Sequence, residues 1–113
     1  MKKLLLLLIP VLLFSCSSNK EKAEKLYKVA EIKFNAEDYQ GAIDEFTKVL
    51  EINPKYAMAY LYRGVSYIKL GEKEKGCNDM EKGFEIAKES DNPESWKAYE
   101  QYYKSFHNIC NQE

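Results

Sequence analysis

The sequence predicts an all-α fold, an α-solenoid of two helix–turn–helix repeats followed by a carboxyl-terminal capping helix. Three observations lead to this prediction: the chain resembles itself at an offset of 34 residues, apolar residues recur three and four positions apart, and the final segment has one apolar and one polar side. Its 113 residues suit one domain. A composition of 45% hydrophobic and 31% charged residues is typical of a folded chain.

The first fifteen residues have the pattern of an export signal. Lys2 and Lys3 precede an unbroken apolar run at residues 4–14. A membrane-spanning helix needs roughly 20 apolar residues, so this run is too short to cross a bilayer. The alternative, a buried core helix, would place Pro10 in mid-helix, where it removes a backbone hydrogen bond. We therefore predict that residues 1–15 are a signal peptide that is removed.

The end of this segment, LFSC at residues 13–16, resembles the lipobox of bacterial lipoproteins. The resemblance implies that Cys16 receives a diacylglyceryl group and becomes the new amino terminus. Buried acyl chains, at roughly 0.8 kcal/mol per CH₂, make such attachment long-lived. Residues 16–22 would then be a short lipidated tether that holds the domain at 23–113 within roughly 20 Å of the bilayer. We expect a lipid anchor in the bacterial cell envelope, on an outer membrane and facing the periplasm.

Two repeats of 34 residues, at 23–56 and 57–90, organise the rest of the chain. Their equivalent positions carry similar residue types, as in the pairs Ala23 and Ala57, Phe34 and Ile68, Glu45 and Asp79, and Ile52 and Ile86. The apolar spacing predicts helices at about 21–35, 39–51, 57–70 and 73–88. Asn53-Pro54 and Gly71 are the expected helix-ending residues.

The residues at these positions resemble the tetratricopeptide repeat family. The first repeat carries Ala30, then Asp38, Tyr39, Ala42, Ile43 and Phe46, and closes with Asn53-Pro54. The second carries Tyr60, Gly64, Tyr67, Gly71, Met80 and Ile86. It departs from the family pattern at Gly76, Cys77 and Gly83, and lacks the closing proline. The resemblance implies stacked helical hairpins over residues 23–90.

A fifth helix is expected at 93–110, with Asn92 as its cap and Pro93 in its first turn. Its apolar side contains Trp96, Tyr99, Tyr103, Phe106 and Cys110, with Tyr102 and Ile109 adjoining. A stack of repeats needs an end cap with a polar outer side, and this helix has both sides. The alternative is a helix that docks on another protein.

The resemblance also implies a concave groove that accepts a peptide or helix of a protein partner. Its predicted lining comes from the first helix of each repeat and consists of Tyr27, Glu31, Phe34, Met58, Leu61, Tyr62, Val65 and Ile68. The helix at 57–70 is apolar nearly all round, so it must be covered on both sides. The alternative is that the fifth helix fills this groove. The Lys and Asn arrangement with which some family members clamp acidic chaperone tails is absent.

Two further sets of residues carry predictions about structure. Cys77 and Cys110 are expected at the same end of two antiparallel helices, where export would favour a disulfide over two buried free thiols. Arg63 stands on an otherwise apolar helix, and an unpaired buried guanidinium would be costly. Asp79 and Glu45 are its candidate ion-pair partners, and an exposed arginine is the alternative.

Composition and motifs argue against catalysis. A net charge of −1 provides no electrostatic field that would attract nucleic acid phosphates. His107 has no acid at helical spacing beside it. The sequence shows no metal-ligand spacing and no phosphate-binding loop, so we expect no metal, cofactor or small-molecule substrate. A thiol-dependent activity of Cys77 and Cys110 is the catalytic alternative.

The expected function is therefore that of a membrane-tethered scaffold that binds a protein or peptide. The alternative is a structural subunit of an envelope assembly that docks through its carboxyl-terminal helix. Two repeats are fewer than the three that a stable stack usually needs, so self-association of the chain is a further alternative.

Overall fold

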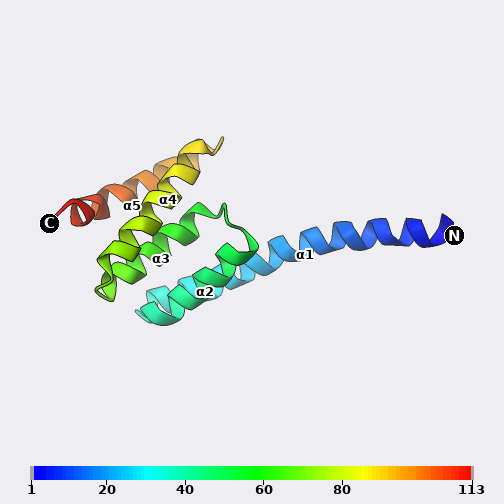
Figure 1. Ribbon diagram of the computed structural model, residues 1–113, viewed down its shortest axis with the longest axis horizontal. Helices are drawn as coiled ribbons and strands as arrows, with labels where there is room; N and C mark the ends of the chain where they lie inside the picture. The colour runs from blue at the N-terminus through cyan, green and yellow to red at the C-terminus, as the bar shows by residue number, and fades with distance from the viewer. Residues whose placement is uncertain (1, 113) are drawn as a thin grey trace.

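The computed structural model describes the backbone of residues 2–112 and the side chains of residues 18–112. The described chain forms five helices and no strand, which confirms the all-α fold class. The helices are α1 (Lys2–Asn35), α2 (Tyr39–Ile52), α3 (Ala57–Lys69), α4 (Lys73–Glu89) and α5 (Pro93–Asn111). Figure 1 shows them as a layered stack, with the amino-terminal part of α1 projecting beyond the others.

The first helix is longer than the sequence prediction. It ends at Asn35 as expected but begins at Lys2 rather than near residue 21, so the segment predicted as a tether, 16–22, has a helical backbone. The helix continues through Pro10, which was expected to disfavour it. Beyond that residue, positions 11–40 contain no Gly or Pro, and residues 20–25 are mostly strong helix formers, so nothing local ends the helix before Asn35. The predicted signal peptide and the side chain of Cys16 lie outside the described side chains. Within those that are described, no helix is long and apolar enough to span a membrane.

Each helix packs on the next, and α3 lies at the centre of the stack. One buried cluster joins α1, α2 and α3 around Phe46, Val49 and Ala59. A second joins α3, α4 and α5 around Leu61, Met80 and Tyr99. Each hairpin thus completes its core with residues from the next element, as expected for repeats that cannot bury their apolar faces alone.

The glycines at which the second repeat departs from the family pattern allow close packing. A Cβ atom on Gly76 would lie 2.5 Å from the carbonyl oxygen of Gly64, and one on Gly64 would lie 2.7 Å from that of Gly76. The backbones of α3 and α4 therefore meet at this pair. A Cβ on Gly83 would collide with the hydroxyl of Tyr99, so Gly83 makes room for α5. Tight packing thus accounts for two residues that are otherwise poor helix formers.

The turn between the two helices of a repeat has the same backbone form in both copies. Glu37 has φ of 62°, and Gly71, which is 34 positions further on, has φ of 85°. Only glycine enters this left-handed region without steric cost. The first repeat therefore carries local strain that the second avoids.

We expect Glu37→Gly to raise the free energy of unfolding by about 0.5–1 kcal/mol, because relief of the left-handed strain outweighs the added freedom of the unfolded chain. Urea denaturation followed by circular dichroism measures the change. The reciprocal variant Gly71→Ala should lose about 1 kcal/mol, and since an added Cβ there meets nothing within 4 Å, the loss reports backbone conformation alone. A destabilised Glu37→Gly protein would contradict this reading of the turn.

Candidate functional site

Aromatic side chains from both repeats meet on the concave side of the stack. Tyr62 of α3 stacks on Phe46 with 5.9 Å between ring centroids, and its edge contacts Phe34 at 5.0 Å and Tyr27 at 6.5 Å. Offset and edge-to-face contacts of this kind add to the stabilisation that burial provides. Three of the predicted groove residues thus form one continuous aromatic wall around Tyr62.

The carboxyl-terminal helix covers the other part of the predicted groove. Leu61 is fully buried and Val65 is 4% exposed. Met58 and Ile68 pack into the same cluster as Tyr99, together with Trp96, Tyr103 and Phe106 of α5. The apolar side of α5 therefore fills part of the predicted groove, beside Leu61, Met58 and Ile68.

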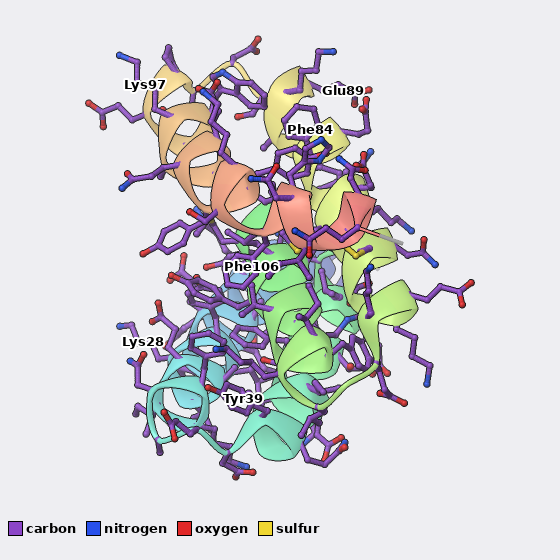
Figure 2. All side chains as sticks on the ribbon, turned by 90° about the vertical axis from the view of Figure 1, so that its left-hand side faces the viewer. Lys28, Tyr39, Phe84, Glu89, Lys97 and Phe106 are labelled. Atoms are coloured by element: carbon purple, nitrogen blue, oxygen red, sulfur yellow. A yellow bond between two sulfur atoms is a disulfide. The ribbon has the colours of Figure 1, made fainter. Side chains whose placement is uncertain are left out.

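A cleft remains between α5 and the first repeat, beside α3. We call it the aromatic cleft; it has a cavity volume of about 310 Å³ and is lined by Phe34, Asn35, Tyr39, Leu61, Tyr62, Val65, Lys69, Tyr102 and Phe106. Tyr102 of α5 is 45% exposed and lies across the cleft from Tyr62, with ring centroids 6.0 Å apart. Figure 2 shows Phe106 beneath α5, on the side that faces the first repeat.

Five of these lining residues were not in the predicted groove. Tyr102 and Phe106 belong to the predicted apolar side of the fifth helix. Their spacing predicts that they face the domain, but it does not predict that they line a cleft. Asn35, Tyr39 and Lys69 stand at helix ends, where polar or aromatic residues carry no pattern that predicts a site.

The cleft holds neutral hydroxyls and one formal charge. Burial raises the pKa of Tyr62 to about 12, and Tyr102 and the carboxylate of Glu31 add to the effect. Burial, assisted by Glu31, also raises the pKa of Tyr27. These tyrosines are therefore uncharged near neutral pH. Lys69 is the only charged residue of the lining, and it is exposed. Such a cleft can bury an apolar or aromatic side chain beside a positive charge.

The tetratricopeptide repeat model of known protein families matches this chain twice, at residues 23–56 and 57–90. The chain belongs to the tetratricopeptide repeat family. The two matches have the same bounds as the repeats predicted from the 34-residue offset. Tetratricopeptide repeat proteins are typically non-catalytic scaffolds for protein–protein interaction.

A solved structure has a similar arrangement of helices. It is a tetratricopeptide repeat domain protein from Salinibacter ruber, with a TM-score of 0.65 and 17% sequence identity. The match covers 77% of this chain and 97% of that one. At this identity the likeness shows the fold and says nothing about a ligand.

Arg63 connects the two tetratricopeptide repeats. Its Nε and Nη2 atoms donate to the two carboxylate oxygens of Asp79 at 2.6 and 2.8 Å, and Nη1 donates to the Thr47 hydroxyl at 3.3 Å. The Arg63 and Asp79 side chains are only 17% and 12% exposed. The bond to Asp79 raises the pKa of the guanidinium further. One side chain of α3 thereby holds both α2 and α4.

Glu45, the other candidate partner of Arg63, forms different ion pairs. Its carboxylate lies 3.1 Å from the ammonium of Lys48 and 3.5 Å from that of Lys33. The hydrogen bond from Lys48 lowers the pKa of Glu45. Glu45 and Asp79 occupy equivalent positions, and each pairs with a base from the first helix of its own repeat. The 34-residue offset predicts that Glu45 and Asp79 are equivalent, but it does not predict which basic residue each one pairs with.

The two cysteines predicted to lie together form a disulfide. Cys77 and Cys110 have Cα atoms 5.7 Å apart and join the start of α4 to the end of α5. The bond closes a loop with a sequence separation of 33 residues, for which chain entropy gives a stabilisation of about 3–4 kcal/mol. Because both sulfurs are paired, neither is a free nucleophile. No group of metal-ligating residues is present among the described side chains, and His107 bonds to Asn111.

We expect Asp79→Asn to lower the free energy of unfolding by about 3 kcal/mol, because it leaves the Arg63 charge poorly compensated in a largely buried place. The double variant Arg63→Met, Asp79→Leu should recover most of this loss, since it removes both charges and keeps apolar volume. Urea denaturation of the single and double variants measures both effects.

The exposed ion pair of Glu100 with Lys104 is the matched control. Its Glu100→Gln variant should lose about 0.5 kcal/mol or less. Equal losses for Asp79→Asn and Glu100→Gln would show that the Arg63 pair does not connect the repeats.

Proposed function

We propose that this protein is a membrane-tethered tetratricopeptide repeat scaffold of the bacterial cell envelope, which holds a peptide segment of a protein partner in its aromatic cleft. The observation that carries the proposal is the cleft itself, where two repeats and α5 leave apolar and aromatic surface open. Family membership supports a role in protein contact. The resemblance of residues 13–16 to a lipobox supports the tether.

The size of the cleft suits one large apolar side chain. An aromatic residue buries about 150–250 Å². At about 25 cal/mol per Å², this contributes roughly 4–6 kcal/mol before the cost of immobilising the partner. One anchoring side chain therefore gives weak binding. Attachment to a membrane would compensate for weak binding, because it raises the effective concentration of a partner on the same surface.

The path of α1 supports a cleft that faces away from the bilayer. If processing leaves Cys16 as the first residue, it stands at the start of a helix that continues to Asn35. At 1.5 Å per residue, Phe34 is roughly 27 Å further along the helix axis. The helical segment 16–22 would span only about 10 Å, less than the extended tether expected from sequence. The lipid and the cleft would lie at opposite ends of α1.

The alternative function, a subunit that docks through its carboxyl-terminal helix, has less support. The apolar side of α5 is already used within the chain, where Tyr99 is fully buried. Its outer side is polar and includes exposed Lys97, Gln101, Lys104 and Asn108. A helix with this outer side fits the role of a cap better than that of a docking element.

Intact-mass spectrometry of the protein purified from membranes tests the tether. We expect residues 1–15 to be absent and Cys16 to carry a diacylglyceryl mass, because the thioether forms at that cysteine. Cys16→Ser should accumulate as an unprocessed precursor without acyl mass, whereas the neighbouring control Ser17→Ala should be lipidated normally. A product that retains Met1 and lacks acyl mass would contradict the tether and leave the cleft to be tested separately.

Selection of peptides from a phage-displayed random library tests the cleft. We expect the enriched peptides to share a large apolar or aromatic residue, and Tyr102→Ser to weaken their binding at least about tenfold, which is ~1.4 kcal/mol. Tyr102→Phe should retain binding, because the ring supplies the contact.

Ile32→Ser is the matched surface control for the peptide selection, since Ile32 is 68% exposed and does not line the cleft. Its affinity for the selected peptides should equal that of the unaltered protein. Equal losses of peptide affinity in Ile32→Ser and Tyr102→Ser would show that the peptides do not bind in the cleft. A selection that enriches no peptide would contradict a peptide-binding site.

A further inference from the structure

The two halves of α5 are held in different ways. The first half is anchored by direct contacts: the Asn92 side chain accepts a hydrogen bond from the backbone N–H of Glu94 at 3.0 Å, and Tyr99 is fully buried. The Tyr99 hydroxyl donates to the carbonyl oxygen of Met80 at 2.7 Å, in the space that Gly83 leaves open. The Asn92 cap stabilises the start of α5 itself, and the buried, hydrogen-bonded Tyr99 fixes this half on α4.

The second half, residues 100–112, contains no side chain that is buried as Tyr99 is. The Tyr103 ring stacks on Phe84 of α4 with centroids 4.2 Å apart, and its hydroxyl donates to the carboxylate of Glu81. At the end of the helix, Lys73 donates to the carbonyl oxygen of Gln112, and the Cys77–Cys110 disulfide joins α5 to α4. Segments with few buried side chains open locally at low free-energy cost. The covalent bond at its far end is therefore the strongest constraint on this half.

We propose that the second half of α5 is a lid over the concave side of α3, and that the Cys77–Cys110 disulfide is its redox-controlled latch. With the bond closed, Tyr102 and Phe106 form one wall of the aromatic cleft. With the bond open, this half separates from α3 beyond Tyr99 and uncovers Leu61 and Ile68. The groove that the repeats alone would present then becomes accessible over a longer stretch. This regulation concerns the site of the proposed function and rests on it.

The chemistry of the latch is thiol–disulfide exchange with a dithiol reductant. A thiolate of the reductant attacks one sulfur of the Cys77–Cys110 bond and displaces the other as a thiolate, which takes up a proton. The second thiol of the reductant then releases the remaining cysteine, so the reductant becomes a disulfide and the protein gains two thiols. Cys77 and Cys110 are both half-buried rather than enclosed, which leaves an approach for the reductant.

Such a latch differs from a structural staple because the rest of the domain has its own anchors. Tyr99 keeps α5 attached to α4, and the Arg63–Asp79 pair keeps α3 on α4. Reduction should therefore loosen residues 100–112 and leave the two repeats folded.

Hydrogen exchange with mass spectrometry on the full chain, oxidised and after reduction with dithiothreitol, tests the proposal. We expect amides in 101–111 to lose protection at least about tenfold on reduction, while those of α2 and α3 keep theirs. Fluorescence of 1-anilinonaphthalene-8-sulfonate should rise in parallel, as apolar surface of α3 becomes exposed.

The variant Cys77→Ser, Cys110→Ser is the control. It should show the reduced pattern with and without dithiothreitol, which separates the latch from any effect of the reductant or of Cys16. Unchanged protection at 101–111 in the reduced protein would overturn the lid, and equal loss of protection across α3 and α4 would show a structural staple instead. Neither readout uses a lipid or a peptide, so failure here is distinguishable from failure of the proposed function.

Discussion

The constraint on which this structure depends is that α3 is apolar on nearly every side and must be covered all round. The first repeat covers one side through Phe46 and Val49, which lie in one cluster with Ala59 of α3. A second side meets α4 where Gly64 and Gly76 bring the two backbones together. The third side lies against α5, through Leu61 and its neighbours. Two hairpins alone would leave this third side in water, so the capping helix is part of the core.

The aromatic cleft is the part of the α3 surface that the neighbouring helices leave uncovered. The first repeat and α5 both border the cleft beside Tyr62, where Tyr102 of α5 approaches the Tyr62 ring. A cleft formed in this way needs no dedicated loop. Its lining combines residues from four helices, α1, α2, α3 and α5, so its shape depends on the position of α5.

Local signals in the sequence predict most of this fold. The starts of α2 to α5 are found where expected, because Asn92-Pro93 and the Gly71 turn act through their own backbone chemistry. The start of α1 is not, since the helix runs through Pro10 and neither Gly nor Pro follows between residues 11 and 40. Ion-pair partners are harder still to predict from the sequence. Basic residues stand at several positions from which they could reach Glu45, and only the packing of the helices selects Lys33 and Lys48.

The groove was predicted only in part, and the reason is geometric. Periodicity reveals which side of α3 is apolar, but the three-residue turn at 90–92 sets the direction of α5, and no residue pattern encodes that angle. The same helix must both complete the core and leave a site open, and these requirements conflict because closer packing narrows the cleft. Tyr99 resolves the conflict at one end by anchoring α5 in the core, while the bond from Cys110 to Cys77 holds the other end on α4. The width of the cleft therefore depends on one buried hydroxyl and one covalent bond as well as on the repeats that line it.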